Sequence, residues 1–168
     1  MHGYLVFLLG IAFVPMLLEM RRSVANEHRL RAAGAVEPAG DVYGVMAVVY
    51  PAGFLAMVGE AWIQGTGWGG TAMAGAVVFA CAKSLKYWAI ATLGERWTFR
   101  VLVPPHSSRT IRGPYTLMRH PNYLAVAAEL VGFALLARAP IAGTLATVIF
   151  GSLMLMRIRV EDRALRAS

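Results

Sequence analysis

Five long apolar segments, almost free of charged residues, limit what this 168-residue chain can fold into. A helix needs about 20 apolar residues to cross the roughly 30 Å hydrocarbon layer of a membrane. All five segments meet this requirement, two of them marginally, and only three residues separate the last two, which predicts a tight helical hairpin. We therefore expect an all-α integral membrane protein with about five transmembrane helices and a single domain over residues 1–168. The expected helices cover residues 4–20, 42–59, 71–93, 121–137 and 141–156.

The composition agrees with a membrane location and excludes several other classes of protein. Hydrophobic residues make up 58% of the chain and charged residues only 15%. An ordinary soluble domain contains about a quarter charged residues. We therefore exclude a disordered chain, a nucleic-acid-binding domain and a water-soluble enzyme. The single cysteine, Cys81, lies in an apolar stretch, so no disulfide framework is expected, and we expect no metal site.

The arginines predict the orientation of the chain in the membrane. The segments 21–41, 94–120 and 157–166 together hold 13 arginines, whereas the segments on the other side hold only Arg138. Cytoplasmic loops of membrane proteins carry the excess of Lys and Arg. We therefore expect the N-terminus outside and the C-terminus in the cytoplasm, which an odd number of spans also requires. The formal net charge of +7 then reflects these loops rather than binding to nucleic acid.

Polar residues gather in the loop 94–122 and in the stretch after residue 156. Within the loop, Arg112-Gly-Pro-Tyr115 is followed by Arg119-His-Pro-Asn-Tyr123. Proline is favoured in the first turn of a helix, so Pro121 predicts a helix start with His120 near its N-cap. An anion there would meet free backbone N–H groups, the helix dipole and two arginine side chains. The Gly-Pro pair predicts a turn at which the backbone approaches a ligand closely.

Three motifs, in order along the chain, resemble those of the isoprenylcysteine carboxyl methyltransferase family of integral-membrane enzymes. Residues 93–98, LGERWT, are similar to the family's LG-x-x-WT segment, and the two loop motifs just described resemble its signature. Residues 157–165, RIRVEDRAL, are similar to its R-x-x-x-E-E-x-x-L box. The resemblance covers about residues 71–165, the expected catalytic core. The chain departs from the family pattern at three places. Leu124-Ala125 stands where the family has a glycine, and Asp162 replaces a glutamate. The sequence also ends at Ser168, where family members usually continue with a polar segment.

The resemblance implies that the protein uses S-adenosylmethionine and releases S-adenosylhomocysteine on the cytoplasmic side. A site for this donor needs a cation for its carboxylate, acids for its ribose diol or ammonium, and aromatic faces for its sulfonium. We expect the loop and the C-terminal box to converge on one cleft that supplies these groups. The predicted donor-binding residues are the cationic Arg112, Arg119 and His120, the acidic Glu161 and Asp162, the aromatic Tyr115 and Tyr123, and Gly113.

Charged residues inside apolar segments are candidates for function. Glu129 lies about 9 Å into the fourth segment and Lys86 about 10 Å from the inner end of the third, at about 1.5 Å per residue. Their equal depth predicts a Lys86–Glu129 pair, either structural or catalytic, while Lys83 would contact an anionic lipid head or reach the interface. A phenolic acceptor, with a pKa near 10, needs a general base. We expect His120 to serve the donor and Glu129 to lie nearer the acceptor, and we predict Glu129 and Arg119 as catalytic residues.

The expected acceptor is a hydrophobic, lipid-like molecule that enters sideways from the inner leaflet. It is either a prenylcysteine-type carboxylate or the hydroxyl of an alkylresorcinol or alkylpyrone. The second choice follows from residues 96–104 and 119–129, which resemble bacterial members of the family encoded beside type III polyketide synthases. That resemblance implies a bacterial inner-membrane protein whose partners are membrane lipids and not nucleic acid, with the oligomeric state left open. A phospholipid N-methyltransferase, a sterol-reductase-like enzyme that uses NADPH and a non-catalytic scaffold remain as alternatives.

Overall fold

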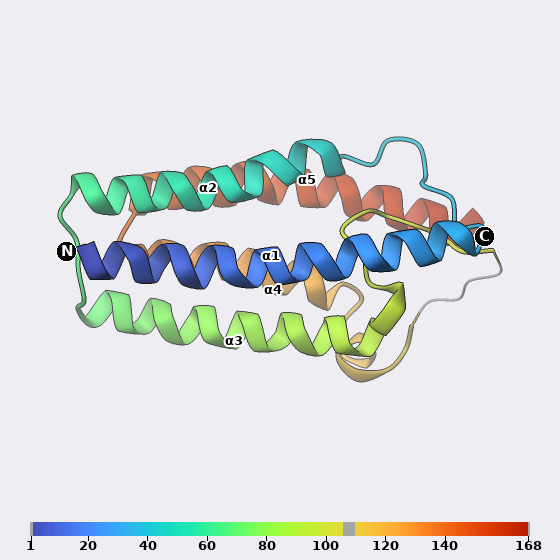
Figure 1. The fold of residues 1–168 in the computed structure, drawn as a ribbon, viewed down its shortest axis with the longest axis horizontal. Coiled ribbons are helices and arrows are strands. Elements are labelled where there is room, and N and C mark those ends of the chain that lie inside the picture. The colour runs from blue at the N-terminus through green and yellow to red at the C-terminus, as the bar shows by residue number, and fades with distance from the viewer. Residues whose placement is uncertain (1, 106–109, 168) are drawn as a thin grey trace.

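The computed structural model describes residues 2–105 and 110–167, so Arg109 and the side chains beyond residue 164 lie outside the description. In the described residues, five helices run side by side along the long axis of the molecule (Figure 1). Two short 3-10 helices lie between the third and the fourth of them. The elements in order are α1 (His2–Ala32), α2 (Tyr43–Ile63), α3 (Gly70–Leu93), η1 (Gly94–Arg96), η2 (Gly113–Thr116), α4 (Pro121–Ala137) and α5 (Pro140–Ala167).

Four of these helices, α1, α2, α3 and α5, are long and apolar enough to cross a membrane. The helix α4 is apolar but has only 17 residues. At about 1.5 Å per residue it is about 26 Å long, slightly less than the hydrocarbon layer. No strand occurs in the described residues, where only an isolated bridge joins Val36 and Val103. The prediction of an all-α integral membrane protein is confirmed, with one helix shorter than the other four.

The predicted bounds hold for α4 and fall short for α1 and α5. The helix α4 covers residues 121–137 as predicted, but α1 continues beyond residue 20 to Ala32 and α5 beyond residue 156 to Ala167. Charged side chains end an apolar segment without ending a helix, because the backbone hydrogen bonds do not depend on them. Both extensions lie at the end of the molecule that also holds the loop after α3 (Figure 1).

The hairpin between α4 and α5 is tight, as predicted, and α2 holds its turn in place. Arg138 follows α4 in the left-handed conformation, with φ 55° and ψ 43°. The carboxylate of Glu60, on α2, accepts hydrogen bonds from the backbone N–H groups of Ile141 (3.2 Å) and Ala142 (2.6 Å). A distant side chain therefore caps the first turn of α5, where backbone donors otherwise lack partners.

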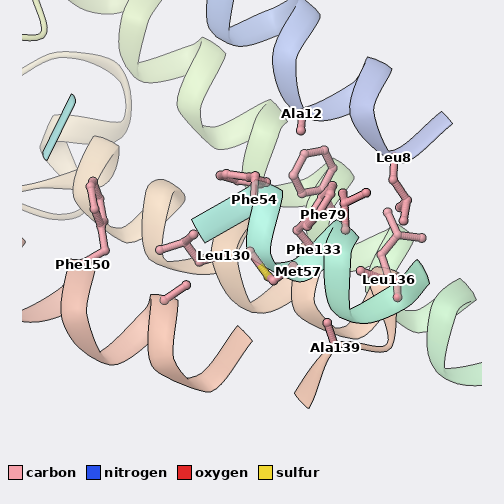
Figure 2. Close-up of a cluster of buried hydrophobic side chains, with 14 of the residues drawn as sticks. Leu8, Ala12, Phe54, Met57, Phe79, Leu130, Phe133, Leu136, Ala139 and Phe150 are labelled. Atoms are coloured by element: carbon pink, nitrogen blue, oxygen red, sulfur yellow. The ribbon is translucent and has the colours of Figure 1, made fainter. Parts of the chain in front are cut away.

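The core forms where α2, α3 and α4 meet. The ring centroids of Phe54 and Phe133 are 4.7 Å apart, and those of Phe79 and Phe133 are 5.8 Å apart (Figure 2). Gly132 allows α4 to approach α3, because a Cβ atom there would lie 2.6 Å from the backbone nitrogen of Phe79. Small residues at such contacts let membrane helices pack closely. This close pairing fixes the position of the N-terminus of α4, where the candidate site begins.

Candidate functional site

The start of α4 meets the C-terminal part of α5 at one end of the bundle. Pro121 is the first residue of α4 and His120 occupies its N-cap position. The Nε2 atom of His120 lies 3.3 Å from Oδ1 of Asp162, and its Nδ1 atom lies 3.9 Å from Oε2 of Glu161. The hydroxyl of Tyr123 donates a hydrogen bond of 2.8 Å to Glu161. Residues that the whole α4–α5 hairpin separates in sequence are therefore in contact.

A cavity of about 120 Å³, which we call the polar cavity, opens beside these contacts. Four of the predicted donor-binding residues line it, namely Tyr115, His120, Tyr123 and Glu161, together with side chains from the loop after α3. Burial raises the pKa of the Tyr115 phenol well above its usual value, and the negative charge of Glu161 raises it further. The Tyr115 hydroxyl therefore stays protonated and remains a hydrogen-bond donor at neutral pH.

Three buried polar atoms on the lining of the polar cavity have no hydrogen-bond partner among the described residues. They are Nε1 of Trp97, Oδ1 of Asn122 and Nε of Arg157. The Arg157 Nε atom lies 3.9 Å from Oδ1 of Asp41, which is too far for a hydrogen bond. Buried polar groups in folded proteins are nearly always paired. Two donors and one acceptor on residues of this lining are therefore candidates for hydrogen bonds with a ligand.

A second cavity, of about 170 Å³, lies deeper in the bundle, and we call it the apolar cavity. Side chains of all five α-helices line it, most of them methionine, aromatic or aliphatic. Met20, on α1, and Ala47, on α2, belong to this lining and are exposed, so the cavity opens between α1 and α2. The two cavities adjoin along what we call the shared wall, formed by Thr98, Asn122, Tyr123 and Arg157.

A buried ionic cluster, formed by Glu19, Lys83, Lys86 and Glu129, lies next to the apolar cavity. The Lys86 Nζ atom is 2.7 Å from Glu19 and 3.3 Å from Glu129, and the Lys83 Nζ atom is 3.3 Å from Glu19 and 3.2 Å from Glu129. The predicted Lys86–Glu129 pair is confirmed. Lys83 is paired with both glutamates, whereas we expected it to contact a lipid head or reach the interface.

Lys86 and Glu129, the predicted pair within the cluster, differ in their access to the apolar cavity. Lys86 lines this cavity, as does Tyr50, whose hydroxyl donates a hydrogen bond to Glu129. Glu129 itself is fully buried and lines neither cavity. A molecule in the apolar cavity would therefore contact Tyr50 and Lys86, and would reach Glu129 only through them.

Asp162 contacts His120 but lines neither cavity, and three further predicted donor-binding residues also lie outside both linings. Arg112 and Arg119 are exposed, and neither they nor Gly113 line the polar cavity. Gly113 has a φ of 55°, as the predicted turn requires. A Cβ atom at this position would lie 2.4 Å from Oγ1 of Thr92, so the glycine packs against α3. The role of these three residues, and that of Arg119 as a catalytic residue, stay predictions.

Sequence analysis missed two residues beside the apolar cavity. Glu19 is the only charged residue in the first apolar segment, and this isolation is a signal that marks it as a candidate. Tyr50 has no comparable signal, because a tyrosine inside an apolar segment is ordinary. Trp97, Asn122 and Arg157 belong to the quoted motifs, but the residue types alone do not show that their polar atoms lack partners.

The C-terminal end of α1 holds the loop that forms one side of the polar cavity. The Nδ2 atom of Asn26 donates hydrogen bonds to the carbonyl oxygens of Gly94 (3.1 Å) and Trp97 (2.8 Å). The hydroxyl of Ser23 accepts a hydrogen bond of 2.7 Å from the backbone N–H of Phe99. The extension of α1 beyond the apolar segment therefore positions the residues of this cavity wall.

The arrangement of the two cavities suits the meeting of two different molecules. Over residues 2–105 and 110–167, no group of three or more His, Cys, Asp or Glu side chains is placed to hold a metal ion. The polar cavity lies at the end of the bundle, and the apolar cavity opens on the side of two membrane helices. A polar ligand and an apolar ligand would therefore meet at the shared wall.

Comparisons with known proteins agree with the motifs described above. The sequence model of the isoprenylcysteine carboxyl methyltransferase (ICMT) family matches residues 73–167. The uncharacterized protein YpbQ of Bacillus subtilis is 30% identical over 159 residues, which cover 95% of each chain. An uncharacterized protein of Haemophilus influenzae is 24% identical over 159 residues, which cover 94% of this chain and 90% of its own. No solved structure matches the chain.

Proposed function

The chain belongs to the isoprenylcysteine carboxyl methyltransferase family of membrane methyltransferases, and from this premise we propose that it methylates an oxygen of a lipid-like acceptor with S-adenosylmethionine as donor. The observation that carries this proposal is the pair of adjoining cavities, one polar and one apolar, with a wall in common. A methyl transfer needs donor and acceptor in contact and in line. The shared wall is where such contact is possible.

The residues of the polar cavity fit the chemical groups of S-adenosylmethionine. The carboxylate of Glu161, and that of Asp162, which contacts the lining residue His120, suit its ammonium or its ribose hydroxyls. The rings of Tyr115 and Tyr123 suit its sulfonium. The unpaired donors and acceptor on the lining would take up hydrogen bonds from its remaining polar groups. When bound, this donor supplies an electrophilic methyl group, and the chain's own residues orient it and exclude water.

Arg112 and Arg119 have a different role in this proposal from the residues of the cavity lining. Both are exposed near the start of α4, close in sequence to the N-cap His120. Together with the helix dipole they would give the approach to the polar cavity a positive potential, which favours the donor carboxylate. Arg119 then acts on donor binding rather than on the reacting atoms.

The apolar cavity fits the acceptor. Its lining of methionine, aromatic and aliphatic side chains suits a hydrocarbon group, and its opening between α1 and α2 faces the lipid of a bilayer. A hydrophobic acceptor would therefore enter from the inner leaflet without passing through water. We propose a bacterial inner-membrane location with the polar cavity on the cytoplasmic side, which follows from the uneven distribution of arginines.

The test is methyl transfer by the purified protein in lipid, with labelled S-adenosylmethionine and a panel of acceptors. The panel contains farnesylcysteine, an alkylresorcinol, an alkylpyrone and phosphatidylethanolamine. We expect label in a carboxylate or hydroxyl product. Label in the lipid amine would instead indicate a phospholipid N-methyltransferase. NADPH that displaces S-adenosylhomocysteine from the protein would indicate a reductase-like site and contradict the proposal.

A further inference from the structure

Tyr50 occupies an unusual position in the apolar cavity. Of the described side chains on this lining away from the shared wall, only Tyr43, Tyr50 and Lys86 carry a polar group. Tyr50 packs against Phe54 and Phe150, with ring centroids 5.0 Å and 4.8 Å away, which fixes the direction of its hydroxyl. The neighbouring rings therefore hold the Tyr50 oxygen between the cavity and the buried ionic cluster.

The hydroxyl of Tyr50 connects the apolar cavity with a carboxylate that the cavity does not reach directly. It donates a hydrogen bond to Oε2 of Glu129, which is fully buried. A tyrosine oxygen donates one hydrogen bond and still has lone pairs to accept another. An acceptor hydroxyl in the cavity would donate to that oxygen, and an unbroken chain of hydrogen bonds would then lead from the acceptor to Glu129.

The charges of the buried ionic cluster favour a neutral acceptor head over a charged one in the apolar cavity. The buried ionic cluster has two lysines and two glutamates, so its formal charges cancel, and each lysine contacts both glutamates. No lysine of this cluster is therefore left to neutralise an additional anionic head. A neutral hydroxyl adds no charge, whereas an ammonium head would be repelled by Lys86 on the cavity lining.

We propose that Tyr50 is a catalytic residue that takes the proton of an acceptor hydroxyl and passes its own proton to Glu129. This inference rests on the proposed function and narrows the acceptor to an un-ionised acidic hydroxyl, such as a phenol or an enol. The acceptor oxygen forms its bond to the methyl carbon with a lone pair, and the electron pair of the broken C–S bond stays on sulfur. The acceptor proton moves to Tyr50, and the Tyr50 proton moves to Glu129. Because the sulfonium charge disappears as the cluster gains a proton, the total charge of the site is unchanged.

The test compares two acceptors with the same alkyl chain. One is an ordinary alkylphenol, which is neutral at pH 7, and the other carries ring fluorines that make it ionised at pH 7. We expect Tyr50→Phe to lower kcat for the ordinary phenol by about 100-fold or more, the usual contribution of acid–base catalysis. The same variant should keep the wild-type kcat for the ionised phenol within about threefold, because no proton has to be removed. Glu129→Gln should give the same pattern.

Two controls separate this role from a structural one. Tyr87→Phe removes a tyrosine hydroxyl from α3 that lines neither cavity, and it should change neither rate. Binding of S-adenosylhomocysteine to Tyr50→Phe should equal that of the wild type, because Tyr50 does not line the polar cavity. Equal losses for both phenols, or no loss for either, would overturn the role of Tyr50.

The wild-type protein separates this inference from the proposed function. If it binds S-adenosylhomocysteine and methylates a farnesylcysteine carboxylate or a lipid amine but neither phenol, the role of Tyr50 is overturned while donor binding stands. If it does not bind S-adenosylhomocysteine, the proposed function itself fails.

Discussion

Three side chains on the polar cavity, Trp97, Asn122 and Arg157, carry buried polar atoms that the protein leaves without hydrogen bonds. A buried polar group without a partner costs about 1–3 kcal/mol of stability. Hydrogen bonds to a ligand would recover this free energy, so these atoms support the proposal that a polar ligand binds in this cavity. Asn122 and Arg157 also belong to the shared wall, where we propose that methyl transfer takes place.

Asn122→Ala tests whether this unpaired oxygen serves a ligand. We expect the affinity for S-adenosylhomocysteine to fall by about tenfold, the loss of one good hydrogen bond. The thermal unfolding midpoint without ligand should stay the same or rise, because no hydrogen bond is lost. Binding of S-adenosylhomocysteine and unfolding of the purified protein in detergent measure the two quantities.

Asn26→Ala is the matched control for this asparagine. The Asn26 amide donates two hydrogen bonds to the loop after α3, so its removal should lower the unfolding midpoint by the equivalent of about 1–3 kcal/mol. If Asn122→Ala destabilises the ligand-free protein as much as Asn26→Ala does, Asn122 has a structural role.

Sequence analysis finds site residues when a motif names them, and fails when a site depends on how helices face one another. His120 and Glu161 belong to motifs, and the structure brings them together. Tyr50 and Glu129 are far apart in sequence, and their hydrogen bond depends on which faces of α2 and α4 pack together. A single sequence gives the apolar segments but not their rotation about the helix axis, so this contact was not predicted.

At the scale of the elements, the helices extend further than the apolar segments from which they were predicted. The end of α4 was predicted correctly because Arg138 and Pro140 bring a turn directly after it. The extension of α1 was not predicted because its residues are polar, yet Ser23 and Asn26 are buried there against the loop. A polar helical turn that packs on a loop has no apolar signature.

The close contact of α3 and α4 predicts the effect of a methyl group at Gly132. A Cβ atom there would lie 2.6 Å from the Phe79 backbone nitrogen, so Gly132→Ala should push the helices apart and cost about 1–3 kcal/mol. Gly59→Ala, on α2, is the control, because no atom lies within 4 Å of a Cβ atom there. Thermal unfolding in detergent should show a lower midpoint for Gly132→Ala alone. Equal midpoints would contradict this packing.

The opening between α1 and α2 predicts how a large side chain would affect acceptor entry. Ala47→Trp should lower kcat/KM for a long-chain acceptor by about tenfold or more. The larger side chain would narrow the apolar cavity, through which we propose that the acceptor chain enters. Short-chain acceptors and S-adenosylhomocysteine binding should be affected much less. Ala52→Trp is exposed on α2 away from the cavity lining and is the control. An equal effect of both variants would place the acceptor entrance elsewhere.

At the scale of the whole molecule, the fold gives the two proposed reactants separate cavities. The polar cavity is formed by the loop after α3 and the ends of α4 and α5, whereas the apolar cavity lies among all five helices. The helical class and the hairpin were predicted because apolar length and turn residues are local properties of the sequence. The cavities were not, because they are spaces left by packing.

The uneven distribution of arginines predicts the side of the membrane on which the polar cavity lies. The test places a single cysteine at exposed Gln64 or at exposed Glu95, in a variant in which Cys81 is replaced by serine. The cysteine at position 64 should react with a membrane-impermeant maleimide in intact cells. The cysteine at position 95 should react only after the cells are opened. The opposite pattern would place the polar cavity outside the cell and contradict the proposed orientation.

Equilibrium binding of S-adenosylhomocysteine to the protein in lipid nanodiscs tests the central claim most directly, namely that the polar cavity holds the methyl donor. We expect saturable binding, and Glu161→Ala should lower the affinity by at least about tenfold. Glu95 is an exposed glutamate at the same end of the bundle, and Glu95→Ala should leave the affinity unchanged. An absence of binding at millimolar concentration, or equal affinity for the wild type and Glu161→Ala, would contradict it.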